Sequence, residues 1–246
     1  QEVLFGVTDA EGLEDNAIAL SIDAGEATEI LIYDAPDGAT FNVGEAIVDA
    51  SGVTAWQVPL EDLEGLTITP PPDSDVDFTL RVNADGESQN LDVNVLAVAD
   101  RPDLAVQSSV GDEDSGPIPL TITPALADTD GSEALSMDVE ITGIPDGAVL
   151  SYNGTPVALT YDAATDSYSA ELDPATVQAL SDQTGSLSIT PPTDFYGDIN
   201  LQVTATSTED AEDAAVSSAS STASFGVTVR PVEDDPDIVV ADASGL

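Results

Sequence analysis

The side chains of this sequence that could do chemistry are almost all carboxylates. Its 246 residues carry 48 Asp and Glu against three basic residues, Arg81, Arg101 and Arg230, and the formal net charge is −45 with no His and no Cys. These absences exclude disulfides, thiolate or imidazole metal sites and Ser-His-Asp triads. The absence of Lys excludes Schiff-base chemistry and P-loops. What remains is carboxylate oxygen, which the hard cations Ca²⁺ and Mg²⁺ prefer.

The charge balance also limits the partners. Three arginines cannot supply the basic surface that nucleic acid requires, and the net charge repels phosphate, so we expect no nucleic-acid partner. The longest apolar runs are too short to span a bilayer, so we expect no membrane insertion of this chain. There is no signal-peptide pattern at the N-terminus. Because the chain opens in mid-pattern, we expect it to be a piece of a longer protein.

The carboxylates are clustered. Dense groups fall at residues 99–103, 112–114, 128–133, 209–213 and 233–237. Like charges at such spacing repel one another unless a counter-ion intervenes, and Ca²⁺ takes about six to eight oxygens at about 2.3–2.6 Å. In the run from Asp128 to Gly131, alternate carboxylates can converge while Gly permits a sharp bend. The alternative for this run is an ordinary Asp-Gly turn.

The chain contains an internal repeat. Residues 66–71 (LTITPP) recur as 187–192 (LSITPP), and 77–84 recur as 198–205, and both 187 − 66 and 198 − 77 give an offset of 121. Each unit closes on an acidic, Pro-containing segment, at residues 99–103 and 233–237. We therefore expect one domain over residues 1–101, a second over 102–235, and the start of a third over 236–246.

Each repeat is predicted to be all-β. Residues 91–95, 135–141 and 199–205 alternate apolar and polar side chains, as half-buried strands do. Asn153-Gly154 predicts a hairpin turn. One short helix is predicted over residues 173–180, with Asp173 as its cap and Pro174 in the first helical position. About seven short strands in a repeat of this length suit an immunoglobulin-like β-sandwich, and a closed, barrel-like sheet is the alternative.

Five phrases of the sequence resemble a known family. These are EDNAIALSI (14–22), LEGLTITPP (63–71), DTDGSEALS (128–136), IPDGAVLS (144–151) and VEDDPDI (232–238). Together they resemble the cadherin-like tandem repeats of large bacterial surface adhesins of the RTX type, over nearly the whole chain. Glu133 stands where cadherins usually carry Asn, and residues 59–62 resemble the cadherin Leu-Asp-Arg-Glu segment without its Arg. The resemblance implies tandem cadherin-like β-sandwiches, export by a type I system and an extracellular place on the bacterial surface.

The resemblance also implies calcium ligands. At the boundary between the two repeats they would be Glu14, Asp15, Glu61, Asp62, Asp100, Asp103, Asp128, Asp130 and Glu133. Half of the next site would be formed by Glu113, Asp114, Asp173, Asp234 and Asp235. Repeat one has Asp23 and Glu26 where the Asp-x-Asp-Gly loop would stand, so we expect a reduced site or none there.

The expected function is that of a non-catalytic extender module, stiffened by calcium, which supports adhesion or biofilm formation as a monomer bound to neighbouring repeats. Repulsion among Asp100, Asp103, Asp128 and Asp130 would open the junction without metal, and a divalent ion would convert it into a crosslink. One alternative is a module that binds polysaccharide through Ca²⁺ or through the region of Trp56. Another is a halophilic acidic surface with no specific ion site.

Other signals have simpler explanations. Trp56 is expected to be a core or edge aromatic of the sandwich, and Phe195-Tyr196 to form a packed turn. Asn153-Gly154-Thr155 fits a glycosylation sequon but has a turn to make. Among so many acids some carboxylate pairs will meet glycosidase spacing by chance, so we expect no enzyme activity.

Overall fold

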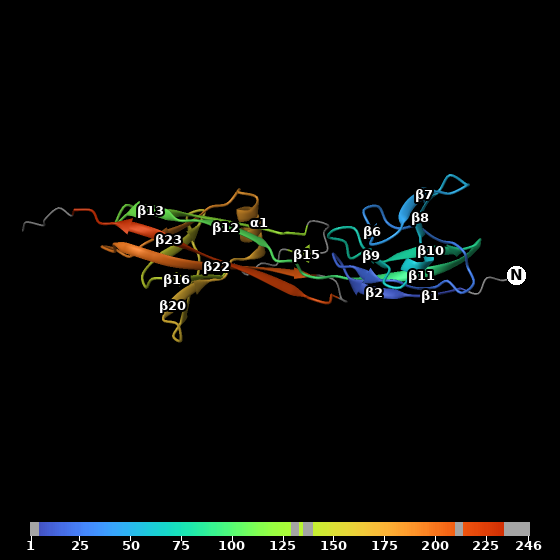
Figure 1. Cartoon of the computed structure of the whole chain (residues 1–246). Helices are drawn as coiled ribbons and strands as arrows, with labels where there is room; N and C mark the ends of the chain where they lie inside the picture. The colour runs from blue at the N-terminus through green and yellow to red at the C-terminus, as the bar shows by residue number, and fades with distance from the viewer. Residues whose placement is uncertain (1–4, 129–132, 135–139, 210–213, 234–246) are drawn as a thin grey trace, which may run out of the picture. The chain divides into compact units, whose positions relative to one another are not determined.

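The chain is all-β, as the alternation of apolar and polar residues predicts. A computed structural model describes residues 5–128, 133–134, 140–209 and 214–233. By its contacts the chain divides into two compact units: unit 1 takes in residues 1–102, 126–136 and 206–220, and unit 2 takes in residues 103–125, 137–205 and 221–246. Figure 1 shows the elements of both.

Unit 1 packs a larger sheet against smaller ones. Six strands follow the order β2-β11-β10-β5-β8-β7, and the partners of this sheet are a three-stranded sheet, β3-β9-β6, and the pair β1-β4. Apolar side chains of both layers form one buried core, with Ile18, Ile68, Leu80 and Val82 at most 2% exposed. The elements are β1 (Gly6–Thr8), β2 (Ala10–Leu13), β3 (Ile18–Ala19), β4 (Ser21–Asp23), β5 (Ile30–Tyr33), β6 (Thr40–Phe41), β7 (Glu45–Val48), β8 (Thr54–Val58), the 3₁₀ helix η1 (Leu60–Asp62), β9 (Thr67–Thr69), β10 (Phe78–Ala84), β11 (Glu87–Leu96) and β15 (Glu133–Ala134).

Strand register decides which loops of unit 1 share an end of the large sheet. Strands β5 and β8 meet at Ile30 and Val58, and Ile30 also pairs with Ala84, the last residue of β10. Strand β11 runs back from that end, so its last residue, Leu96, and its partner Leu13 of β2 lie at the opposite end. The helix η1 follows β8, whereas the acidic pair after β2 follows Leu13, and the two therefore lie at opposite ends.

Unit 2 consists of two facing sheets. A five-stranded sheet has the order β12-β14-β21-β17-β18, and a second sheet has the order β13-β23-β22-β16-β20-β19 with β15 paired to β22. Strands β22 and β23 are long, antiparallel neighbours whose residues are shared between the two units. The remaining elements are β12 (Asp103–Gln107), β13 (Ser109–Asp112), β14 (Ile118–Ala125), β16 (Glu140–Ile144), β17 (Val149–Tyr152), β18 (Thr155–Pro156), β19 (Thr160–Asp162), β20 (Ser167–Ala170), α1 (Pro174–Ser181), β21 (Leu187–Thr190), β22 (Gly197–Glu209) and β23 (Ser218–Arg230).

Local sequence signals are confirmed where the structure describes them. Strands β17 and β18 pair on either side of Asn153-Gly154, both of which have positive φ. The predicted helix is α1, with Asp173 as its cap, accepting a hydrogen bond from the backbone N–H of Thr176. The strands expected over 91–95 and 199–205 lie within β11 and β22. Of the strand expected over 135–141, residues 135–139 lie outside the described residues.

The two sequence repeats share one strand pairing. A strand near the start of each repeat pairs in parallel with the last strand of the same repeat, β2 with β11 and β13 with β23. Because each unit is built from separate sheets, with one short α-helix in unit 2, the architecture is two tandem Ig-like or cadherin-like β-sandwiches rather than a closed barrel. In the described part of the chain no helix combines the length and the hydropathy needed to cross a lipid bilayer.

Candidate metal centre

Glu14 is anchored at the end of β2 by the chain that follows β11. Its backbone N–H donates to the Leu96 carbonyl at 3.1 Å, and its Oε1 accepts the backbone N–H of Val98 at 2.5 Å. The side chain is only 2% exposed, and its Oε2 makes no hydrogen bond to any residue that the structure describes. One oxygen of Glu14 therefore fixes the side chain, and the other is buried with no donor among the described residues.

Glu133 is arranged in the same way from another segment. It lies on β15, where it pairs with Glu209 of β22, and both carboxylates are buried. The backbone N–H of Asp100 donates to Oε1 of Glu133, whereas Oε2 has no hydrogen-bond partner within the described ranges. The hydroxyl of the fully buried Ser207 donates to the Asp100 carbonyl and so holds the same loop from β22. Asp128, which precedes β15, is 2% exposed.

A group of three carboxylates lies close to these buried acids. One side-chain oxygen each from Asp15, Asp73 and Asp100 lies within 4.8 Å of the others. The backbone N–H of Asp73 donates to Oδ1 of Asp15 at 3.0 Å, which ties the loop after β9 to the residue after Glu14. Asp15 and Asp73 both have positive φ, at 54° and 55°, a conformation that Asp tolerates better than most residues.

The pKa values show how strongly these groups affect one another. Burial raises the pKa of Glu14 from 4.5 to about 7; the Val98 hydrogen bond opposes this, and Asp128, Asp15 and Asp75 add to it. Burial likewise raises the pKa of Glu133 to about 7, against the Asp100 hydrogen bond and with the charges of Asp128, Asp100 and Glu209. Burial and the charges of Asp15 and Asp73 raise the pKa of Asp100. Each of these acids is thus destabilised as an anion mainly by burial and further by the charges of its neighbours.

No basic side chain of the described residues forms an ion pair with Glu14, Asp15, Asp73, Asp100 or Glu133. Among the described residues one ion pair occurs, between Arg81 and Asp34, at 3.2 Å. The donor set consists of carboxylate oxygens, and those of Glu14 and Glu133 include one buried oxygen each to which no described residue donates. Such a set fits a hard divalent cation, and Ca²⁺ accepts its many ligands and its irregular geometry more readily than Mg²⁺ does. These residues therefore fit a calcium ion.

Unit 2 repeats the anchoring half of this group. Oε1 of the buried Glu113 accepts the backbone N–H of Val232 at 2.7 Å, as Glu14 does with Val98. The backbone N–H of Asp194 donates to Oδ1 of Asp114 at 3.2 Å, and both residues have positive φ, as Asp73 and Asp15 have. Each sequence repeat thus has the same three acidic residues in the same hydrogen-bonding arrangement, Glu14, Asp15 and Asp73 in the first and Glu113, Asp114 and Asp194 in the second.

The structure brings together part of the expected ligand set. Glu14, Asp15, Asp100, Asp128 and Glu133 belong to unit 1 and are linked by the hydrogen bonds and charge effects above. Glu113 and Asp114 form the similar half in unit 2. Asp130, Asp234 and Asp235 lie outside the described residues.

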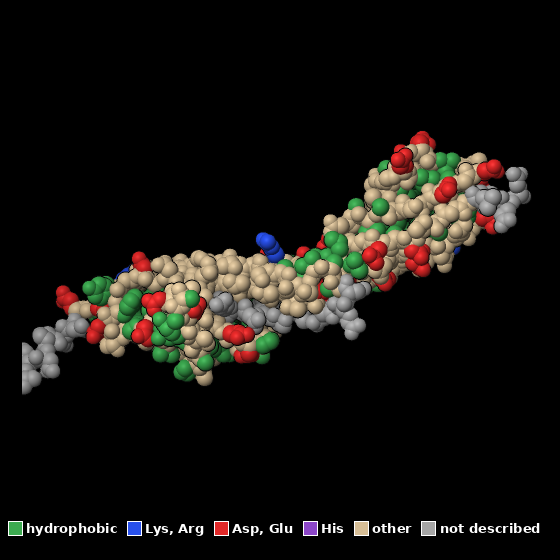
Figure 2. All heavy atoms as spheres, turned by 90° about the horizontal axis from the view of Figure 1, so that it is seen from below, with side chains coloured by type: hydrophobic (Ala, Val, Ile, Leu, Met, Phe, Trp, Pro, Cys, Tyr) green, Lys and Arg blue, Asp and Glu red, His purple; other side chains and the backbone are tan. Residues whose placement is uncertain are grey.

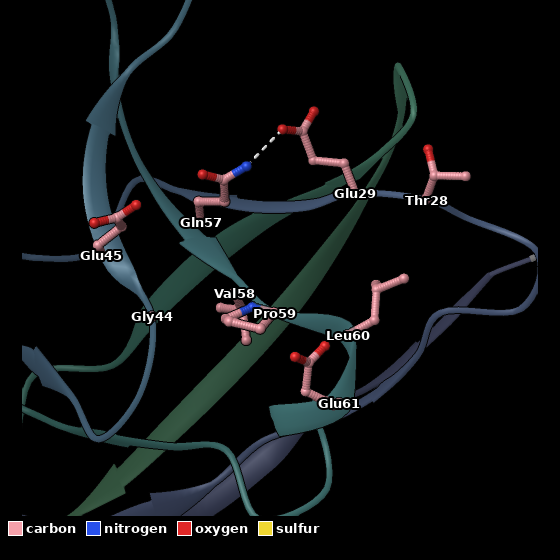
Figure 3. A pocket seen from close by; sticks show the side chains of 9 residues that line it. All are labelled: Thr28, Glu29, Gly44, Glu45, Gln57, Val58, Pro59, Leu60 and Glu61. Carbon is pink, nitrogen blue, oxygen red and sulfur yellow. Dashed lines mark hydrogen bonds between the residues drawn. The ribbon is translucent and has the colours of Figure 1, made fainter.

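Glu61 and Asp62 are not brought to this group. They lie on η1, at the opposite end of the six-stranded sheet from Glu14, because β8 runs toward the Ile30 end. Figure 3 shows Glu61 beside a pocket of about 610 Å³ whose lining also includes Glu29, Glu45 and Gln57. The Gln57 side-chain amide donates to Glu29 at 2.8 Å there.

Asp103 and Asp173 have other positions. Asp103 is the exposed first residue of β12 in unit 2 and pairs with Ala125. Asp173 caps α1, accepting hydrogen bonds from the backbone N–H and hydroxyl of Thr176, which lower its pKa. Its carboxylate is therefore already used in the fold.

Sequence reasoning did not assign Asp73, Asp75 and Glu209 to this group. A signal for Asp73 was present: the repeat offset of 121 that relates 66–71 to 187–192 also relates Asp73 to Asp194, directly after the Pro-rich phrase. Glu209 was visible only as part of an acidic cluster, because its pairing with Glu133 depends on long-range strand register.

Two further regions have structural explanations. Trp56 is half-buried, stacks on Phe41 with ring centroids 5.2 Å apart, and donates its indole N–H to the Val43 carbonyl at 2.7 Å. It is an edge aromatic of the core, as expected. At the reduced loop of repeat one, Oδ1 of Asp23 accepts the backbone N–H of Gly25 at 3.0 Å, which makes a turn.

Many other carboxylates are exposed, unlike the buried members of this group. Figure 2 shows Asp and Glu side chains scattered over the face that it displays. The buried acids Glu14, Asp128, Glu133 and Glu209, each at most 6% exposed, are a separate population.

The chain is similar to solved tandem domains. No protein-family model and no curated protein sequence matches it. Human mucin-like protocadherin EC1-2 is 15% identical, with 94% of this chain and 100% of that chain covered and a TM-score of 0.31. Protocadherin gammaB7 EC3-6 is 14% identical, with 94% and 48% covered and a TM-score of 0.32. The collagen adhesin (CNA) of S. aureus is 11% identical, with 93% and 92% covered and a TM-score of 0.25. The fold class itself is established by the strand topology described above.

Proposed function

We propose that this chain is a calcium-stiffened, non-catalytic extender of a large bacterial surface adhesin of the RTX type. In this proposal its two domains, over residues 1–101 and 102–235, are links of a longer array that is exported by a type I system and displayed outside the cell. The extender supports adhesion or biofilm formation by holding a binding tip at a distance. The support for the adhesin family is the resemblance of the five sequence phrases, 14–22, 63–71, 128–136, 144–151 and 232–238.

One observation carries the calcium part of the proposal: Glu14 and Glu133 are buried with one oxygen each that no described residue satisfies. An unsatisfied buried charged group costs several kcal/mol, so a fold keeps one only where something else compensates it. A divalent cation compensates both side chains at once. It also compensates Asp15, Asp73 and Asp100, whose oxygens already lie within 4.8 Å of one another.

The position of these residues in the sequence connects the ion to stiffness. Glu14, Asp15 and Asp73 belong to the first sequence repeat, Asp100 to the acidic linker and Glu133 to the second repeat. An ion that these residues share would crosslink three segments that otherwise repel one another. If free Ca²⁺ exceeds the dissociation constant by about 100-fold, one site adds about 2.7 kcal/mol to the stability of the native state.

Small-angle scattering with and without a chelator tests this proposal. The expected result is that removing Ca²⁺ from the wild-type chain changes the maximum dimension and lowers the melting temperature. The variant E14Q/E133Q should lose this response to Ca²⁺, because it keeps the side-chain shapes but removes the two buried charges.

The matched control is E61Q/D62N, which removes the same number of carboxylates at the opposite end of the sheet. This variant should respond to Ca²⁺ as the wild type does. An unchanged maximum dimension together with an unchanged melting temperature in the wild type would reject the extender mechanism. An equal loss of response in both variants would assign the effect to general charge screening.

A further inference from the structure

The solvent face of one sheet in unit 2 contains a groove whose lining is polar and largely uncharged. The groove has a volume of about 460 Å³ and lies over β16, β19, β20 and β22. Its lining consists of Thr142, Gly143, Asp162, Thr165, Ser167, Ser169 and Gln202. This lining contains one carboxylate, that of Asp162, and five hydroxyl or amide side chains.

Strand alternation places these side chains outside the core. In β20, Ala170 is buried, so Ser167 and Ser169 point to the other face of the sheet. In β22, Leu201 and Val203 are buried, and Gln202 between them is exposed. The groove is therefore lined by the solvent side of the sheet and requires no opening of the sandwich.

A bulge in β16 shapes the floor of the groove. The register between β16 and β20 shifts between Ile141 and Ile144, and Gly143 within this step has φ +82°. A Cβ atom at residue 143 would lie 2.1 Å from the Asn200 carbonyl oxygen, so only glycine allows this close approach of the two strands. Bulges of this kind bend a strand and redirect its side chains.

The groups in the groove fall into two sets. Asp162 accepts the backbone N–H of Ala164 at 2.8 Å and the Thr165 hydroxyl at 3.1 Å, and the Thr165 and Ser167 hydroxyls are 2.9 Å apart. These hydrogen bonds hold the rim of the groove in place and already engage Asp162, the one carboxylate of the lining. By contrast, the side chains of Thr142, Ser169 and Gln202 make no hydrogen bond to any residue within the described ranges.

We propose that this groove binds a neutral polysaccharide. Hydroxyl and amide groups both donate and accept hydrogen bonds, and this combination matches a ligand that carries many hydroxyls. An anionic ligand would meet no basic side chain in the groove and a chain of net charge −45. A cationic ligand would find more carboxylates in the pocket of unit 1, which contains Glu29, Glu45 and Glu61. The volume lies in the range of about 300–1,000 Å³ that is usual for small-ligand sites.

This proposal is independent of the calcium centre, because the groove lies in unit 2 and contains no residue of that centre. Binding should therefore be the same in Ca²⁺ and in a chelator. It is also independent of the tyrosines on the same hairpin: Tyr161 and Tyr168 pack together at 5.0 Å, with their hydroxyls on Asp166 and Asp146.

Affinity electrophoresis in native gels that contain dextran, mannan or galactomannan tests the proposal, with alginate as the acidic comparison. We expect at least one neutral polysaccharide to retard the wild-type chain, and alginate to have no effect. The variant T142A/Q202A removes two cross-strand partners in the groove. It should raise the dissociation constant at least tenfold.

The matched control is Q107A/T121A, which removes a second Gln–Thr cross-strand pair, exposed on the five-stranded sheet of the same unit. It should be retarded like the wild type. Thermal melting checks that both variants are folded. The proposal is overturned if none of the three neutral polysaccharides retards the wild type, if alginate alone does so, or if the two variants lose binding equally.

Discussion

Glu14 and Glu133 each use one carboxylate oxygen to accept a hydrogen bond from a backbone N–H, and the other oxygen is buried with no donor among the described residues. In both, Oε1 accepts a backbone N–H, from Val98 and from Asp100 respectively, and Oε2 has no partner in the part of the chain that the structure describes. Such a group costs free energy in the metal-free protein and favours binding of a cation. In the proposed calcium site, the same atoms would lower stability without metal and bind the ion when it is present.

The raised pKa values predict a pH dependence of the metal-free protein. Glu14 and Glu133 have pKa values of about 7 in the folded protein, above the ordinary 4.5, so the folded state binds protons more tightly than the unfolded state. Their favourable contribution is complete below about pH 4.5 and is lost as the pH rises through about 7. In a chelator the melting temperature should fall by a few °C or more between about pH 5 and pH 8.

Saturating Ca²⁺ should abolish or reverse this fall, because binding requires the ionised carboxylates. Differential scanning calorimetry at several pH values, in chelator and in Ca²⁺, checks both statements. A melting temperature in chelator that is flat or rises over this pH interval would contradict the burial of the two acids as charged groups.

Asp73 provides a test at a single residue. Its backbone N–H bonds to Asp15 and its side chain is one of the three carboxylates within 4.8 Å. The variant D73N keeps the shape and the backbone bond and removes one charge. We expect calcium affinity to fall about tenfold, equivalent to about 1.4 kcal/mol. Titration calorimetry measures this change.

The control for D73N is D194N, at the same position of the second repeat. Asp194 bonds to Asp114 as Asp73 bonds to Asp15, but the group in unit 1 does not include it. Its calcium affinity should stay within about twofold of the wild type, a difference of about 0.4 kcal/mol. Equal effects of the two variants would indicate that net charge, rather than ligation by Asp73, governs calcium binding.

Among the elements, helix α1 depends on its N-cap residue, Asp173. Asp173 accepts two hydrogen bonds from Thr176 and precedes Pro174 at the start of the helix. Replacing it with Ala should lower the free energy of unfolding by about 1 kcal/mol, with a range of about 0.5–2, and Asn should largely restore it. Urea denaturation measures these values.

The variants at Asp173 also show whether this residue acts only as a helix cap or also as a calcium ligand, when their calcium affinity is measured. If Asp173 serves only α1, D173A leaves the calcium affinity unchanged. A calcium affinity that falls in D173A while the free energy of unfolding in chelator is preserved would restore Asp173 to the ligand set that the sequence resemblance implied.

The elements that sequence could predict are those with local causes. Asn153-Gly154 tolerates positive φ, and Asp173-Pro174 supplies a cap and a preset φ, so a hairpin and a helix follow from a few adjacent residues. Period-two alternation likewise predicts strands such as β22, in which outward residues are polar and the inward residues from Ile199 to Ala205 are apolar. For the same reason the all-β sandwich could be predicted.

The candidate metal centre was only partly predictable because its members are distant in sequence. Glu133 is positioned by its pairing with Glu209, and Glu61 lies elsewhere because of the direction of β8. Both depend on long-range strand pairing, which the neighbouring residues in the sequence do not determine. Burial of Glu14 likewise depends on Val98, 84 residues away. Asp73 is the exception, since the repeat offset already related it to Asp194.

The whole chain carries a charge of −45, and a general acidic surface is the simplest competing explanation for its composition. Such a surface attracts Ca²⁺ only through its general negative charge, and a high concentration of sodium chloride screens that attraction. A specific site with buried ligands is different, because its oxygens have few competing partners and its geometry selects a divalent ion. The two explanations therefore predict different calcium binding when sodium chloride is in large excess: a general acidic surface loses it, and a specific site keeps it.

Calorimetric titration of the wild-type chain with Ca²⁺ in about 0.5 M NaCl, where the screening length falls to only a few Å, is the most direct test. We predict saturable binding of Ca²⁺ that persists at this salt concentration, is lost in E14Q/E133Q and is retained in E61Q/D62N. Binding that disappears at high salt, or that is equally weak in both variants, would contradict a buried calcium centre.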